Sequence, residues 1–387
     1  MNKEELLSGF AKAFGGGGEI RGYFAPGRVN LIGEHIDYNG GHVFPCALNT
    51  GNTAVVRQRD DRKLRFFSAN YPRLGILEAS LDDLVKRSES WTNYVKGVIW
   101  GLEKRGMSVT KGFDLYIYGN IPGSGLSSSA AMEVVVGTML KDYYGFDLTP
   151  VDIACIGQEA ENGFIGMNCG IMDQFASAMG KKGQAIFLDT ATLEYQYVPL
   201  RLEGCKIVVT NSNKPHSLVS SHYNERRQEC EKALSDLQKA LPVSALCQLT
   251  PEQFEANKSL IADPLCRMRA KHAVYEEDRT KKAVKALMAN DLVTFGRLLN
   301  ESGDSLRYDY DATCPEIDAL VEEARKQEGV YGSRETGGGW GGNTVSIVRE
   351  DCVEAFRRNV TEAYRERTGL RCSVYELEVG DGGRRIF

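Results

Sequence analysis

A glycine- and serine-rich stretch from Gly123 to Val135, GSGLSSSAAMEVV, has the composition of an anion-binding loop. Glycines allow positive φ and close backbone approach, and serine hydroxyls can cap a helix, bind phosphate or ligate magnesium. A helix N-terminus adds unpaired N–H groups and the positive end of the helix dipole. The stretch lacks the G-K-[ST] sequence of a Walker-type loop. It predicts a phosphate site neutralised from elsewhere in the chain, with an ordinary serine-capped helix as the alternative.

A second polar segment, residues 25–41, reads APGRVNLIGEHIDYNGG. It has too many polar side chains for a core strand and too many apolar ones for a solvated linker. A single histidine or aspartate near a turn is usually a structural group. As a cluster, however, these side chains predict hydrogen bonds to a polyhydroxylated or anionic ligand; they are Arg28, Asn30, Glu34, His35, Asp37 and Asn39.

The segment CGIMDQF, residues 169–175, places one carboxylate, Asp173, between apolar residues. A buried acid of this kind either pairs with a cation or works as a base. Both interpretations stay open from these residues alone.

The run GGGWGG at 337–342 formally contains G-x-G-x-x-G. In a dinucleotide-binding fold that pattern follows a strand and opens a helix, whereas here the alternating residues 343–348 predict a strand after it. The Rossmann interpretation therefore fails. So many glycines still predict backbone brought close to another chain segment or to a ligand.

The elements around these motifs follow from apolar spacing. Residues 112–118 alternate with period two and predict a strand, and residues 132–143 have helical spacing, so the first loop joins a strand to a helix. Residues 215–330 are mostly helical in pattern, residues 343–348 and 373–379 predict strands, and 352–367 a helix between them. The change of pattern near 200–210 predicts two domains, residues 1–205 and 206–387.

Composition agrees with a two-domain globular protein. The chain has 387 residues, 42% hydrophobic and 26% charged, and single cores stop growing at roughly 250–300 residues. Its net charge of −5 argues against a nucleic-acid partner, and no apolar run or signal-like N-terminus predicts a membrane or secreted location. Scattered cysteines and histidines predict neither zinc nor disulfides. We expect a cytoplasmic protein whose oligomeric state stays open, a monomer included.

Taken together, the motifs resemble the galactokinases of the GHMP kinase superfamily over nearly the whole chain. The residues that carry this likeness are GRVNLIGEHIDYN at 27–39, PGSGLSSSA at 122–130 and the glycine-rich third motif at 336–342. Trp340 and Asn343 stand where phenylalanine and a small residue or cysteine are common. The resemblance implies an α+β, two-domain GHMP kinase fold with the active site in the cleft between the domains.

The resemblance also implies the chemistry and its residues: transfer of the ATP γ-phosphoryl group to the C1 hydroxyl of α-D-galactose. Arg28 and Asp173 match the catalytic pair, and Ser128 and Glu161 match magnesium ligands, with Ser127 and Ser129 as alternatives to Ser128. The implied ATP-binding residues are Trp91, Pro122, Gly123, Ser124, Gly125, Leu126, Ser127, Ser128, Ser129 and Ala130.

For the sugar, the resemblance implies contacts from six residues, Glu34, His35, Asp37, Gly170, Asp173 and Tyr223. Asp37 and Tyr223 are candidates for recognising the 4-hydroxyl, and Asn39 with His42 favours galactose over its C2-substituted analogues. Two alternatives are an N-acetylgalactosamine kinase or other sugar-1-kinase, and a galactose and ATP sensor without catalysis. The retained Ser129-Ala130 pair favours catalysis over the sensor.

Overall fold

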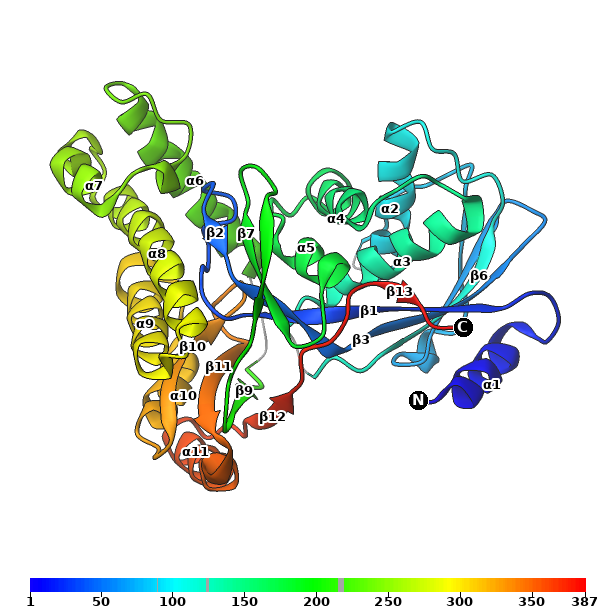
Figure 1. Ribbon diagram of the computed structural model, residues 1–387. Helices are drawn as coiled ribbons and strands as arrows, with labels where there is room; N and C mark the ends of the chain where they lie inside the picture. Colours follow the sequence, from blue (N-terminus) through cyan, green and yellow to red (C-terminus); the bar gives the residue numbers. More distant parts are fainter. Residues whose placement is uncertain (89, 123–124, 215–218) are drawn as a thin grey trace.

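The computed structural model describes residues 1–88, 90–122, 125–214 and 219–387. A six-stranded sheet, formed mostly by the first half of the chain, has the order β13-β1-β3-β6-β4-β5 (Figure 1), and of its described strands only β4 and β6 pair in parallel. The strands are β1 (Arg21–Asn30), β3 (Pro45–Gln58), β4 (Lys63–Ser68), β5 (Leu77–Ser80), β6 (Phe113–Gly119) and β13 (Arg384–Arg385).

Helices cover both faces of this sheet. One face lies under α3 (Ser128–Tyr144) and α5 (Met172–Met179), and these helices contact α2 (Thr92–Lys104) and α4 (Pro150–Glu159). The other face is covered by α1 (Lys3–Phe14), whose Leu6, Phe10 and Phe14 are buried at the spacing of one helix stripe. The predicted strand and helix are confirmed as β6 and α3.

The second half is built on a four-stranded antiparallel sheet in the order β10-β11-β9-β12. Its strands are β9 (Cys205–Asn211), β10 (Val330–Thr336), β11 (Asn343–Arg349) and β12 (Ser373–Leu377). One face packs on α8 (Pro264–Met288) and α9 (Leu292–Ser305), and the other on α10 (Pro315–Arg325) and α11 (Val353–Thr368). The predicted late strands and the helix between them are thereby confirmed.

The remaining elements connect or flank these layers. A small sheet joins β2 (His42–Val43), β7 (Gln184–Asp189) and β8 (Tyr195–Pro199), and α6 (Val219–Gln238) and α7 (Pro251–Asn257) lie at one end of the molecule. Single turns of 3-10 helix are η1 (Pro72–Leu74), η3 (Leu246–Gln248), η4 (Lys258–Leu260) and η6 (Glu350–Cys352), and π-helical turns are η2 (Ala160–Ile165) and η5 (Leu306–Tyr310).

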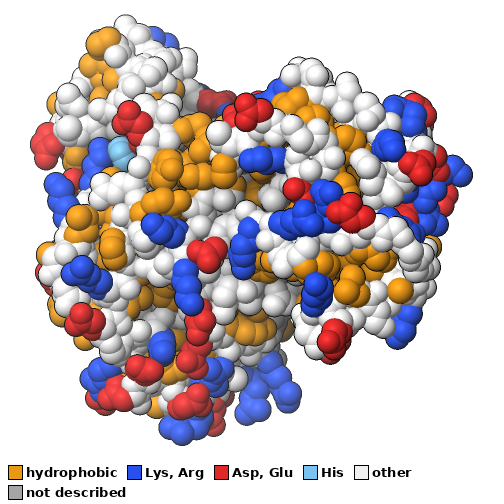
Figure 2. Space-filling view, turned by 45° about the vertical axis from the view of Figure 1, so that its right-hand side comes forward, with side chains coloured by type: hydrophobic (Ala, Val, Ile, Leu, Met, Phe, Trp, Pro, Cys, Tyr) orange, Lys and Arg blue, Asp and Glu red, His pale blue; other side chains and the backbone are white. Residues whose placement is uncertain are grey.

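The chain crosses between the two halves more than once. The boundary predicted near residue 205 falls where β9 begins, but β13 returns to the first sheet and pairs with β1. The division into residues 1–205 and 206–387 therefore stays a prediction. No described helix is both long and apolar enough to cross a bilayer, and Figure 2 shows basic and acidic side chains intermixed over the face in view.

Candidate active site

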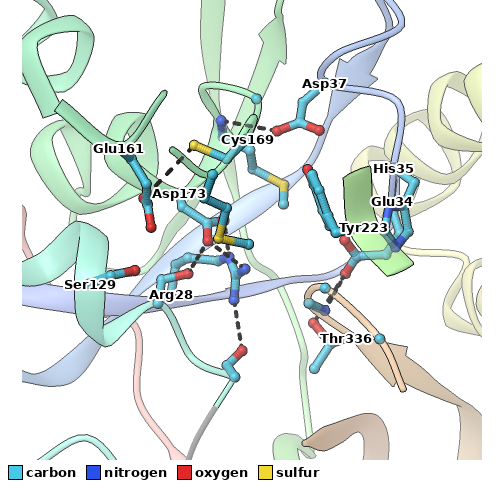
Figure 3. A pocket seen from close by; sticks show the side chains of 18 of the residues that line it. Arg28, Glu34, His35, Asp37, Ser129, Glu161, Cys169, Asp173, Tyr223 and Thr336 are labelled. Carbon is cyan, nitrogen blue, oxygen red and sulfur yellow. Dashed lines mark hydrogen bonds and ion pairs between the residues drawn. The ribbon is translucent and has the colours of Figure 1, made fainter. Parts of the chain in front are cut away.

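An ion pair between Arg28 on β1 and Asp173 on α5 forms the centre of the site (Figure 3). Arg28 donates from Nε to Asp173 Oδ1 at 2.7 Å and from Nη2 to Oδ2 at 2.9 Å, which is the paired geometry that suits a guanidinium and a carboxylate. Burial disfavours the charged guanidinium, but Asp173 and Glu34 outweigh it and hold the pKa of Arg28 above its ordinary value. The guanidinium of Arg28 therefore stays charged.

The side chain of Asp173 is more exposed than that of a buried acid. Its side chain is 31% exposed, against 4% for Arg28, so the carboxylate faces the pocket while the guanidinium lies behind it. Ser127 donates from Oγ to Asp173 Oδ2 at 2.5 Å. The sequence-based expectation of an acid paired with a cation is confirmed, and the expectation of burial was wrong.

The serine-rich loop reaches this pair directly. Arg28 Nη1 donates to the carbonyl of Gly125 at 3.1 Å. Ser127 stands at the start of α3 with φ of 59° and makes no capping hydrogen bond, because its hydroxyl is directed at Asp173. The capping role considered for this serine is therefore wrong.

The loop residues divide between the pocket and the core. Leu126 and Ala130 are fully buried in the hydrophobic core, and Pro122 lies outside both cavities described below. Gly123 and Ser124 lie outside the described residues. The loop residues that line the pocket are Gly125, Ser127, Ser128 and Ser129.

Glu161, in the π-helical turn η2, presents a second carboxylate to the same pocket. Burial and the neighbouring Asp173 raise its pKa to about 7, although hydrogen bonds from Ser129, Cys169 and Gln174 act in the opposite direction. Figure 3 shows Ser129 and Glu161 on the same side of the pocket. No arginine or lysine among the described residues forms an ion pair with Glu161, so a bound cation would stabilise its charged form.

At the other end of the pocket, Glu34 is fixed by the second half of the chain. Its Oε1 accepts from Arg334 Nη2 at 3.0 Å, from Thr336 Oγ1 at 3.3 Å and from the backbone N–H of Gly337 at 2.8 Å. Arg334 is fully buried and also donates to the carbonyls of Asn30 and Leu31. The first motif is thus held in place by β10.

His35 and Asp37 lie beside Glu34 with altered proton affinities. Burial, with His272 and nearby arginines, lowers the pKa of His35 to about 3, so its imidazole is neutral, and Nδ1 lies 2.8 Å from the hydroxyl of Tyr38. Burial and Asp173 raise the pKa of Asp37 to about 7. A Cβ on Gly170 would lie 2.1 Å from Asp37 Oδ2, so only glycine leaves room for this carboxylate.

The two glycine-rich loops contact each other across the site. A Cβ on Gly337 would lie 2.9 Å from the carbonyl oxygen of Gly125, and one on Gly339 would lie 2.4 Å from that of Ala312. Several of these glycines also line the pocket. Contact with another segment is therefore confirmed for the glycine run, and its approach to a ligand stays a prediction.

These groups enclose a cavity of about 250 Å³ lined by both halves of the chain. A second cavity of about 280 Å³ shares Ser128 and Ser129 with the first and contains Trp91. The proposed catalytic and sugar residues all line the first cavity; they are Arg28, Glu34, His35, Asp37, Gly170, Asp173 and Tyr223, together with Glu161.

Two residues predicted to favour galactose have structural partners instead. Asn39 donates from Nδ2 to the carbonyl of His35, and His42 bonds through both its backbone N–H and Nδ1 to Glu277. Neither lines the cavity. Residues that the sequence analysis missed include Met167 and Met172 in the wall, and Arg334. The signal for Arg334 was a pair of adjacent charged residues, Arg334 and Glu335, in the strand before the glycine run.

Comparisons with known proteins agree with this geometry. The galactokinase galactose-binding signature matches residues 8–58, the GHMP kinases N terminal domain matches 93–181, and the GHMP kinases C terminal model matches 283–366. The galactokinase of Clostridium beijerinckii is 52% identical over 387 residues, covering 100% of this chain and 99% of that protein. The galactokinase of Bacillus subtilis is 48% identical over 386 residues, with 99% of each covered.

Solved structures show the same relationship. The crystal structure of Lactococcus lactis galactokinase complexed with galactose has a TM-score of 0.97 and 45% identity, covering 99% of both chains. A mevalonate kinase, at 16% identity and a TM-score of 0.65 over 94% of this chain and 99% of that one, shares the fold alone. With identity near one half over its full length, this chain belongs to the galactokinase family of the GHMP kinases.

Proposed function

We propose that this chain transfers the γ-phosphoryl group of ATP to the C1 hydroxyl of α-D-galactose, giving α-D-galactose 1-phosphate and ADP. The observation that carries the proposal is the position of the Arg28–Asp173 pair. The pair lines the first cavity together with Glu34, His35 and Asp37. This cavity shares Ser128 and Ser129 with the second cavity, which is lined by Trp91. Sugar and nucleotide can thus meet at one charged pair.

In the proposed step, the C1 oxygen bonds to the γ-phosphorus as the bond to the β–γ bridging oxygen breaks. The hydroxyl proton passes to Asp173, and ADP is the leaving group. Arg28 and Ser127 hold the carboxylate in one orientation, and the guanidinium stabilises charge on the transferring oxygens.

On the sugar side, we assign hydroxyl contacts to the residues that line the first cavity. The 4-hydroxyl distinguishes galactose from its epimer glucose, and a site built to hydrogen-bond one hydroxyl rejects the wrong epimer because its polar groups stay unpaired. Asp37 and Tyr223 are the candidates for that contact, since both line the cavity wall, where Tyr223 is buried and Asp37 is half-buried.

We also assign Mg²⁺ to the region of Glu161 and the loop serines. A carboxylate and hydroxyl groups are oxygen ligands of the kind that Mg²⁺ prefers, and one or two protein ligands suffice beside phosphate oxygens and water. Ser129, which bonds to Glu161, joins Ser128 as a candidate ligand. When bound, the ion supplies positive charge to the phosphate oxygens.

We place the enzyme in the cytoplasm, in keeping with ten cysteines that are all free.

The test is ADP release by purified protein supplied with ATP, Mg²⁺ and one sugar at a time. We expect turnover on galactose, and much less on N-acetylgalactosamine or glucose. A clear preference for N-acetylgalactosamine would replace the substrate, and binding of galactose and ATP without ADP release would make the protein a sensor.

A further inference from the structure

A buried glutamine connects the two carboxylates on the metal side of the site. Gln174 directly follows Asp173 on α5 and is completely buried. Its Nε2 donates to Glu161 Oε2 at 2.8 Å and to Glu133 Oε2 at 2.9 Å. Both hydrogens of one amide are therefore used on carboxylates that belong to two other elements, η2 and α3.

Glu133 has no place in the proposed chemistry. It lies one turn after Ser128 and Ser129 on α3, is completely buried, and lines neither cavity. Its Oε2 accepts a hydrogen bond from Gln174, and its Oε1 has no partner among the described residues. A buried acid is costly unless it is hydrogen-bonded, and Gln174 supplies that hydrogen bond.

The helix α4 closes the space behind this pair. A Cβ on Gly157 would lie 3.0 Å from Gln174 Cγ and 3.2 Å from Glu133 Cβ. Both side chains therefore pack closely against α4. Glu161, in contrast, faces the pocket and accepts a hydrogen bond from Gln174.

We propose that Gln174, anchored by Glu133, is a positioning residue that orients Glu161 to ligate the divalent cation. Two consecutive residues of α5 then have separate roles: Asp173 accepts the proton, and Gln174 orients Glu161. The inference rests on the proposed function, because it takes Glu161 as the cation ligand. Groups that orient metal ligands typically change metal affinity by about 10–100-fold when they are removed.

The experiment measures Mn²⁺ affinity by electron paramagnetic resonance in the presence of saturating ADP. Gln174→Met keeps the volume and removes both donors, and we expect it to weaken Mn²⁺ binding about tenfold or more. Binding of ADP in EDTA, and of galactose, should stay within about twofold of the original values. The matched control is Gln158→Met, since Gln158 binds the carbonyl of Cys169 and not Glu161.

Two outcomes would overturn the inference: unchanged Mn²⁺ affinity in a folded Gln174→Met protein, or equal losses for Mn²⁺, metal-free ADP and galactose. Glu133→Gln provides a second variant if the first does not fold. We expect it to lose less Mn²⁺ affinity than Gln174→Met, and an unchanged affinity would contradict the anchoring role of Glu133.

Glu161→Gln distinguishes the assignment of Glu161 as a ligand from the positioning role of Gln174. If it leaves Mn²⁺ affinity unchanged, the assignment of Glu161 as ligand fails. If it weakens Mn²⁺ but Gln174→Met does not, only the positioning role fails.

Discussion

The two ends of the active-site cavity stabilise their carboxylates in different ways. At the sugar end, Glu34 is paired with the buried Arg334 and accepts two further hydrogen bonds from β10 and the residue after it. At the other end, where we propose that Mg²⁺ binds, Glu161 has a neutral amide and a serine, with no ion pair to any described lysine or arginine. The first carboxylate is neutralised by the fold itself, whereas the second is left to be neutralised by what binds.

The central pair between these ends should give the largest effect. Asp173→Asn keeps the shape of the side chain but removes its charge and its ability to accept the proton. We expect kcat to fall by about 10²–10⁴-fold, with galactose binding still detectable by calorimetry. An almost fully active variant would show that the carboxylate has another role.

Stability provides a direct test of the difference between the ends. Arg334→Met leaves Glu34 buried without its cation, and breaking such a pair costs about 3–5 kcal/mol of unfolding free energy. Glu161→Gln removes a buried charge that has no cation partner in the fold, so the free protein should unfold at the same denaturant concentration or higher. Equal losses in the two variants would contradict the comparison.

A smaller effect is expected from the glycine that makes room for Asp37. Gly170→Ala would place a methyl group within 2.1 Å of the Asp37 carboxylate, and overpacking of this kind costs about 1–3 kcal/mol. Galactose affinity should fall about tenfold or more while ADP affinity is unchanged. Gly16→Ala, at a position with nothing within 4 Å, is the control. Unchanged galactose affinity would remove Asp37 from the sugar contacts.

The smallest effect concerns pH at the sugar end. His272 donates to the carbonyl of Glu34, and burial lowers its pKa to about 4 from an unfolded value of 6.5. The unfolded chain therefore binds a proton first, and this histidine costs stability as pH falls from 7 to 5, by about 1–2 kcal/mol. Asp37, with its pKa raised to about 7, acts in the opposite direction, because the folded state binds the proton first.

The variants separate the two contributions. Between pH 7 and pH 5, His272→Gln should lose less stability than the original protein, and Asp37→Asn should lose more. Urea unfolding at three or four pH values measures both slopes. Identical slopes in all three proteins would show that neither group titrates as described.

Local sequence patterns predicted the helices and strands better than they predicted the contacts between distant side chains. The strand at 113–119 and the helix after the serine loop follow from apolar spacing, which depends on neighbouring residues only. The Arg28–Asp173 pair was implied by family resemblance and is found in the structure. The Arg334–Glu34 pair joins residues 300 positions apart, so spacing could not reveal it. Ser127 does not cap the helix, because its hydroxyl donates to Asp173, a partner 46 residues away that the spacing of the serine loop could not reveal.

The pairing of β13 with β1 affects the order in which the protein can be completed. Tyr23 and Phe24 on β1 pair with Arg385 and Arg384, and the N–H of Gly22 donates to the carbonyl of Phe387. Ribosomes add about 5–20 residues per second, so these partners emerge on the order of tens of seconds after β1. During that interval this edge of the sheet is an unpaired template for other strands. Shortening the chain by its final residues should therefore increase aggregation during synthesis more than it changes the catalytic site.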